Sequence, residues 1–175
     1  MSKDLIIAGT GHRPKYCPCK YKNNHPWLIA LKQRLKGYFA ETIYIMRFDD
    51  TKIIIRTGGA IGWDTWLAQV ALELDLTLHL YLPFKDQGKE WPSDSRKEYE
   101  RIKGEADKII YTSENYHPKV FFDRDLAMIT GVDKVVSLLD PKVNSGGTFY
   151  TVEETKKLGI DIVNFWEDLN SNETK

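Results

Sequence analysis

Cysteine is scarce in this sequence, whose 175 residues include only Cys17 and Cys19. One pair of cysteines cannot form the disulfide network that holds small secreted domains together. An excess of charge is also absent, because 25 Lys and Arg residues balance 25 Asp and Glu residues. Domains that bind polyanions are usually basic, so this balance argues against a dedicated nucleic-acid binder.

Long apolar runs are missing as well, since no stretch approaches the ~18 continuous apolar residues of a membrane helix. The first four residues lead directly into a short apolar run, without the layout of a signal peptide. The hydrophobic content of 42% and the charged content of 29% are ordinary for a globular chain. We therefore expect one cytoplasmic domain over residues 1–166, with no membrane contact, followed by a polar tail over residues 167–175.

Six short apolar runs predict β-strands. They lie at residues 5–8, 53–55, 78–82, 109–111, 135–139 and 160–165. Their side chains show little alternation between apolar and polar, which is typical of strands that are covered on both faces. Such strands belong to a parallel sheet between two layers of helices.

Helical periods separate these runs. The longest apolar stripe extends from Leu28 to Met46 and follows Pro26, which suits the first turn of a helix. Residues 43–48 could alternatively form a strand, but continuation of the helical stripe is the simpler interpretation. Four further helices are predicted around Trp66, Tyr99, Leu126 and Val152. The alternation predicts an α/β, Rossmann-like, doubly wound fold with a mainly parallel sheet of about six strands and helices on both faces.

Three glycine-containing loops follow predicted strands, at residues 9–14, 57–64 and 144–148. In an open parallel sheet, ligands bind beyond the carboxyl ends of the strands. Glycine permits close backbone approach, and a helix amino end offers free N–H groups to an anion. Together the loops predict a phosphate-binding site. The sequence contains neither the Walker pattern nor a Gly-x-Gly-x-x-Gly after the first strand.

Five segments resemble the SLOG superfamily, which includes the LOG phosphoribohydrolases and DprA, and most of all its YpsA/YspA-like branch. They are Thr-Gly-His-Arg-Pro-Lys at 10–15, Thr-Gly-Gly-Ala-Ile-Gly-Trp-Asp at 57–64, Leu-Pro-Phe at 82–84 with Trp-Pro at 91–92, Arg-Asp-Leu-Ala-Met at 124–128 and Ser-Gly-Gly-Thr at 145–148. The likeness extends from about residue 5 to residue 165. It implies a Rossmann-like fold and a nucleotide ligand.

The resemblance also implies a set of site residues. Ligand contacts are expected from Thr10, Gly11, His12, Arg13, Gly58, Gly59, Ala60, Gly62, Asp64, Asp140, Ser145, Gly146, Gly147 and Thr148. In LOG enzymes an arginine and a carboxylate at similar positions are catalytic, which would assign Arg124 to the sugar phosphate. Glu153 would then stabilise the positive charge that develops at the anomeric carbon.

Several of these residues have simpler interpretations. Arg124 could form an ordinary helix ion pair, Glu153 could be an acid favoured by the helix dipole, and Asp64 could cap a helix. Asp140 could hold a turn instead of a ribose. Trp91 could close its own loop instead of stacking on a base.

The sequence predicts no cofactor and no metal site. Cys17 and Cys19 are separated by one residue, whereas structural zinc sites use Cys pairs with at least two residues between them.

Three functions remain open. The first is a sensor or sequestering module for a nucleotide or an ADP-ribose-like molecule. The second is an enzyme that hydrolyses the N-glycosidic bond of a nucleoside monophosphate with Arg124 and Glu153. The third is DprA-like binding of single-stranded DNA, which the balanced charge makes the least expected. A homodimer is also expected, since SLOG relatives often pair.

Overall fold

The computed structural model describes residues 3–48 and 50–166. Six strands form one sheet in the order β4-β3-β2-β1-β5-β6, and all five neighbouring pairs are parallel. The strands are β1 (Leu5–Gly11), β2 (Ile53–Thr57), β3 (Thr77–Leu82), β4 (Lys108–Tyr111), β5 (Lys134–Leu138) and β6 (Asp161–Asn164). The helices are α1 (Pro26–Met46), α2 (Trp63–Glu73), α3 (Ser93–Glu105), α4 (Val120–Ile129) and α5 (Gly147–Lys157). The six predicted strands and the predicted doubly wound fold are thus confirmed.

Helix α1 shows how local sequence determines one element. The His25 ring accepts a hydrogen bond from the backbone N–H of Trp27 at 3.1 Å, and Pro26 occupies the first helical position. Leu28, Leu31 and Leu35 then recur on one buried face. The helix continues to Met46, so the alternative strand at residues 43–48 does not form.

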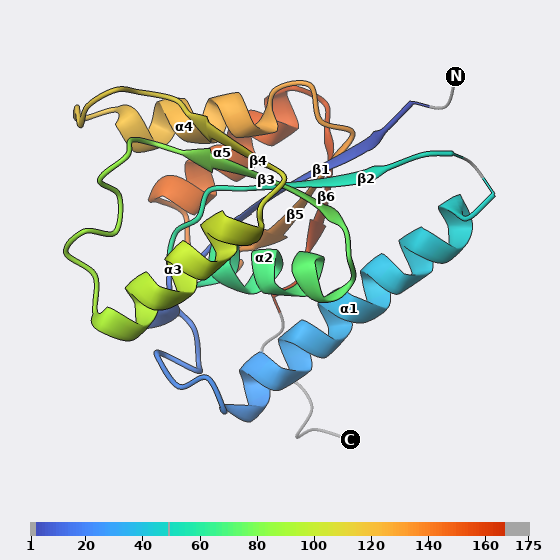
Figure 1. Cartoon of the computed structure of the whole chain (residues 1–175), viewed down its shortest axis with the longest axis horizontal. Coiled ribbons are helices and arrows are strands. Elements are labelled where there is room, and N and C mark those ends of the chain that lie inside the picture. Colours follow the sequence, from blue (N-terminus) through green and yellow to red (C-terminus); the bar gives the residue numbers. More distant parts are fainter. Residues whose placement is uncertain (1–2, 49, 167–175) are drawn as a thin grey trace.

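The sheet lies between two layers of helices. Helices α1, α2 and α3 cover one face, and α4 and α5 cover the other (Figure 1). The larger core lies under the first layer and includes Trp27, Trp63 and Trp66. A smaller core that contains Met128 and Val135 lies under α4 and α5.

The strand order reverses beside β1. From β1 the chain proceeds through β2, β3 and β4 toward one edge, and it then returns to place β5 on the other side of β1. Residues Gly9 and Gly11 pair with Val136 and Leu138 across this junction. Because the connections after β1 and β5 leave toward opposite faces, a crevice opens at their carboxyl ends. This is the switch point of the sheet.

Among the described residues, no helix has both the length and the apolar character needed to cross a membrane. The predicted polar tail at residues 167–175 lies outside the described part of the chain.

Candidate ligand-binding site

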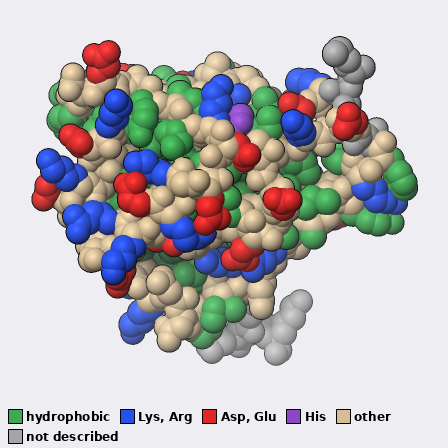
Figure 2. Space-filling view, viewed as in Figure 1, with side chains coloured by type: hydrophobic (Ala, Val, Ile, Leu, Met, Phe, Trp, Pro, Cys, Tyr) green, Lys and Arg blue, Asp and Glu red, His purple; other side chains and the backbone are tan. Residues whose placement is uncertain are grey.

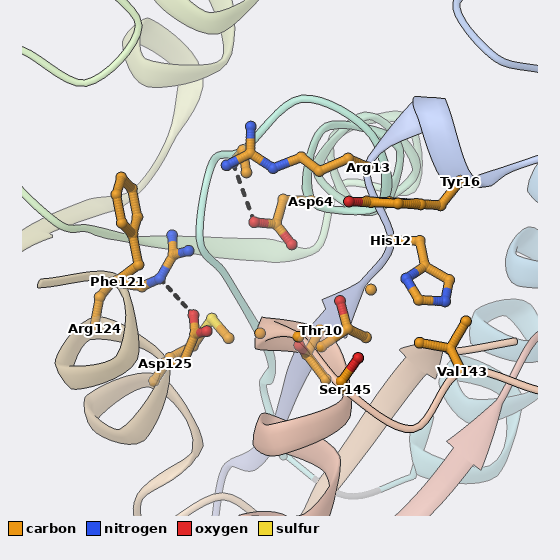
Figure 3. A pocket seen from close by; sticks show the side chains of 16 residues that line it. Thr10, His12, Arg13, Tyr16, Asp64, Phe121, Arg124, Asp125, Val143 and Ser145 are labelled. Carbon is orange, nitrogen blue, oxygen red and sulfur yellow. Dashed lines mark hydrogen bonds and ion pairs between the residues drawn. The ribbon is translucent and has the colours of Figure 1, made fainter. Parts of the chain in front are cut away.

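A cavity of about 390 Å³ lies at the switch point. Its walls come from the segment after β1, the loop after β2, one face of α4 and the loop after β5 (Figure 3). The residues that line it are Thr10, Gly11, His12, Arg13, Tyr16, Ala60, Asp64, Phe121, Arg124, Asp125, Met128, Val143, Ser145, Gly146, Gly147 and Thr148. The fold therefore brings together residues that are more than a hundred positions apart in the sequence.

The loop after β5 presents backbone to the cavity. All four residues from Ser145 to Thr148 line it, and α5 begins within this segment at Gly147. Gly146 has a φ of 90°, a conformation that favours glycine, and no side chain caps the helix. A Cβ at Gly146 or Gly147 would meet no described atom within 4 Å. The amino end of α5 is consequently open to an anion.

The loop after β2 is packed against other parts of the protein. A Cβ at Gly58 would collide with the Arg124 guanidinium and lie 2.8 Å from Asp64 Oδ2. At Gly62, where φ is 107°, it would lie 2.7 Å from the carbonyl oxygen of His12. Gly58, Gly59 and Gly62 are not among the described residues that line the cavity, and only Ala60 and Asp64 represent the predicted loop there.

Arg124 forms part of the cavity wall. Its Nη1 donates to the carbonyl oxygens of Gly58 and Tyr81, and its Nε donates to Asp125 Oδ1 at 2.7 Å. The residue is only 5% exposed, and its contact with Asp125 is a helix ion pair of the kind considered in the sequence analysis. These bonds of Nε and Nη1 hold the guanidinium in place, and Arg124 is one of the residues that line the cavity.

Asp64 is a buried carboxylic acid in the first turn of α2. Its Oδ2 accepts a hydrogen bond from the backbone N–H of Ala60 at 3.1 Å. Burial raises the pKa of Asp64 to about 6, with a further contribution from the negative charge of Asp125, while Arg124 opposes the shift. The exposed Arg13 side chain extends toward Asp64 from the segment after β1 (Figure 3).

His12 is held as a neutral ring. Its Nε2 accepts a hydrogen bond from the backbone N–H of Asp140 at 3.0 Å, which assigns the ring proton to Nδ1. Burial lowers the pKa of His12, although the nearby Asp140 charge opposes this effect. Asp140 itself closes a turn, because its Oδ1 accepts from the backbone N–H of Lys142 at 2.9 Å. Asp140 is not among the described residues of the cavity wall.

Glu153 is not brought together with Arg124 in the cavity wall. Its Oε1 forms an ion pair with Lys156 Nζ at 2.7 Å, on the partly exposed surface of α5. Thr151, which lies near Asp125 with 3.1 Å between Oγ1 and Oδ2, marks the side of α5 that faces α4. Two residues later a helix has turned by about 200°, so Glu153 projects from a different side of α5.

Sequence reasoning omitted five residues that line the cavity, namely Tyr16, Phe121, Asp125, Met128 and Val143. Three of them share α4 with Arg124, and their spacing could have identified them. Positions 121, 124, 125 and 128 recur at the three- and four-residue steps of one helix face.

The remaining sequence candidates lie elsewhere. Trp91 packs against Tyr99 with 5.1 Å between ring centroids, which fits the interpretation that it closes its own loop. Cys17 and Cys19 are buried free thiols. Over residues 3–48 and 50–166, no three His, Cys, Asp or Glu side chains gather in a way that could hold a metal ion.

The sheet order and the cavity define a Rossmann-like α/β protein with a candidate ligand site at the switch point. The chain belongs to the YspA SLOG family, whose profile matches residues 7–163. It is similar to UPF0398 proteins of Bacillus thuringiensis strain Al Hakam and Bacillus cereus strain AH187. Each is 29% identical over 161 residues, and each match covers 88% of this chain and 84% of the relative. The predicted resemblance is thereby confirmed.

Solved structures of similar fold include two DNA processing proteins A. The Streptococcus pneumoniae protein has a TM-score of 0.62 at 14% identity, and the match covers 95% of this chain and 52% of that one. This chain thus spans about half its length. The Helicobacter pylori protein, described for its single-stranded DNA binding mode, has a TM-score of 0.61 at 19% identity, with coverage of 95% and 67%. At these identities the likeness concerns the fold alone.

Proposed function

We propose that the switch-point cavity binds a phosphorylated ribosyl compound, either a nucleotide or an ADP-ribose-like molecule, and that the protein senses or sequesters it. The strongest support for the proposal is the position of Arg124 relative to α5. The buried Arg124 lines the same cavity that receives the open amino end of α5. A guanidinium and a helix amino end are both suited to phosphate.

The phosphate would lie between Arg124 and the backbone of Gly146 and Gly147. Each of these groups supplies positive charge or N–H donors. The exposed Arg13 lines the same cavity and would add a second guanidinium.

The ribose would lie toward the two cavity carboxylates, Asp64 and Asp125. Carboxylate oxygens accept hydrogen bonds from sugar hydroxyls, and each oxygen has more than one acceptor position. Asp125 Oδ1 accepts from Arg124 and its Oδ2 lies 3.1 Å from the Thr151 hydroxyl, so this carboxylate is held in a fixed orientation. A fixed acceptor discriminates in favour of ligands that carry a hydroxyl at that point.

Hydrolysis of an N-glycosidic bond is less well supported than binding. The catalytic pair that the resemblance implies, Arg124 and Glu153, does not come together, because Glu153 is paired with Lys156 outside the cavity wall. Single-stranded DNA binding also has weak support. On the face shown in Figure 2, Lys and Arg side chains are interspersed with Asp and Glu, and no continuous basic path is visible.

Calorimetric titration with ribose 5-phosphate, AMP and ADP-ribose tests the proposal. We expect saturable binding of at least one compound and no release of free base during prolonged incubation. Arg13→Gln should weaken the binding about tenfold, because it removes an exposed cation from the cavity without disturbing the core.

Arg96→Gln provides the matched control. Arg96 is an exposed arginine on α3, outside the described cavity wall, and its loss should leave the affinity unchanged. Absence of binding by all three compounds contradicts the proposal. Release of free base would instead identify an enzyme.

A further inference from the structure

Three aromatic side chains form a cluster beside the cavity. The rings of Phe84 and Phe121 lie 6.2 Å apart between centroids at 64°, and those of Phe84 and Tyr116 lie 6.0 Å apart at 88°. We call Phe84, Tyr116 and Phe121 the aromatic cluster. None of the three belongs to the two hydrophobic cores defined by the described residues. Phe121 remains 38% exposed and Tyr116 67% exposed, so core packing does not account for them.

Phe121 connects this cluster to the cavity, because it is the member that lines it. It precedes Arg124 by three residues on α4 and therefore lies on the same face of the helix. Figure 3 shows the Phe121 ring beside Arg124, with Ser145 farther along the cavity. The three-residue step corresponds to a rise of about 4.5 Å between the two positions along the axis of α4.

This arrangement has a chemical preference. The Phe84 ring contacts Phe121 and Tyr116 and supports Phe121 from outside the cavity, which limits the orientations available to the Phe121 ring. A rigid aromatic ring with an accessible face stacks well on a flat heterocycle, and such stacking tolerates different bases. A bare sugar phosphate would leave that ring uncovered.

We infer that Phe121 is a base-stacking residue and that the ligand is a nucleotide whose heterocycle covers its ring. This inference rests on the proposed function, since it extends the phosphoribosyl site at its aromatic end. Arg124 and the amino end of α5 hold the phosphate, and Phe121 selects for a compound that carries a base.

The test compares AMP, GMP, CMP and UMP with ribose 5-phosphate, which lacks the base. With the unmodified protein, at least one nucleotide should bind about tenfold more tightly than ribose 5-phosphate. Phe121→Leu keeps an apolar side chain but removes the ring, and it should abolish this advantage while it changes the affinity for ribose 5-phosphate by less than about twofold. Phe121→Tyr should retain the advantage, because it keeps the ring.

Phe122→Leu is the matched control. Phe122 neighbours Phe121 on α4 and is similarly exposed, but it lies outside the described cavity wall. It should leave all affinities unchanged, and thermal unfolding should verify that each variant is folded.

Two results overturn the inference while the proposed function stands. In the first, ribose 5-phosphate binds as tightly as every nucleotide. In the second, the nucleotide still binds more tightly than ribose 5-phosphate in Phe121→Leu. This result overturns the assignment to Phe121 even if Tyr16→Leu, which removes another aromatic ring of the cavity wall, reduces the difference. Absence of binding by all five compounds instead contradicts the proposed function, and the base-stacking assignment with it.

Discussion

The glycine loops after β2 and β5 have nearly the same sequence signature but different surroundings. Around Gly58 and Gly62 the space that a side chain would occupy is filled by Arg124, Asp64, His12 and Pro14. Around Gly146 and Gly147, which line the cavity, no described atom lies within 4 Å of the corresponding position. The first loop uses glycine to let other groups pack closely, whereas the second uses glycine to leave room.

The difference shows that a glycine pair after a strand does not by itself predict whether the loop contacts a ligand or packs against other parts of the protein. The loop after β2 brings the Arg124 guanidinium close to its own backbone, and that contact helps to hold a residue of the cavity wall in place. The loop after β5 would receive the ligand directly. One loop therefore acts through a positioned side chain, and the other acts through its own main chain.

The largest effect is expected from Gly58→Ala. The new methyl group would displace Arg124 from its carbonyl partners and crowd Asp64, so the free energy of unfolding should fall by about 4 kcal/mol. Urea unfolding followed by tryptophan fluorescence measures this change. A loss below 1 kcal/mol would show that the loop can rearrange, and would weaken the contrast between the two loops.

Asp64→Asn tests the buried acid of the first loop through its pH dependence. The pKa of Asp64 is raised from 3.8 to about 6 in the folded protein. Between these values the folded chain retains a proton that the unfolded chain has lost, so the unfolding free energy falls as pH rises from about 4 to about 6. Relative to Asp64→Asn, the unmodified protein should lose up to about 3 kcal/mol over this window.

Unfolding of both proteins at pH 4, 5, 6 and 7.5 provides the comparison, and other titrating groups cancel in the difference. The opposite result would be an unfolding free energy of the unmodified protein that rises with pH relative to that of Asp64→Asn. It would mean that Asp64 is an ionised partner of Arg124 with a lowered pKa.

Gly147→Ala should have the smallest effect on folding and a clear effect on binding. Its Cβ meets no described atom within 4 Å and its φ is not positive, so the unfolding free energy should change by less than about 0.5 kcal/mol. Because Gly147 lines the cavity, a methyl group there should crowd a phosphate bound at the amino end of α5 and reduce the affinity for ribose 5-phosphate about tenfold. Unchanged affinity would argue that the phosphate does not lie against α5.

Much of the fold could be predicted from the sequence because its signals are local. Continuous apolar runs identify the six strands, and the stripe from Leu28 to Phe39 identifies α1 from neighbouring residues alone. The position of the cavity follows in part, since the carboxyl ends of parallel strands share one edge.

The assignment of particular residues could not be predicted with the same success. Arg124 fills the space beside Gly58 but lies 66 positions later in the sequence. The reason for a glycine at position 58 therefore depends on the topology of the fold. Glu153 follows Gly146 and Gly147 at a position similar to that of the catalytic carboxylate in the LOG enzymes. Its position on the helical turn of α5 nevertheless places its side chain beside Lys156. Phe121 required only helical spacing relative to Arg124, and that signal was present in the sequence.

Backbone amide shifts of isotope-labelled protein during titration with ribose 5-phosphate show which of the two glycine loops receives the phosphate. Binding at the amino end of α5 should produce saturable shifts at Gly146, Gly147 and Thr148, together with much smaller shifts at Gly59 and Gly62. Large shifts confined to the loop after β2, or none near α5, would contradict it.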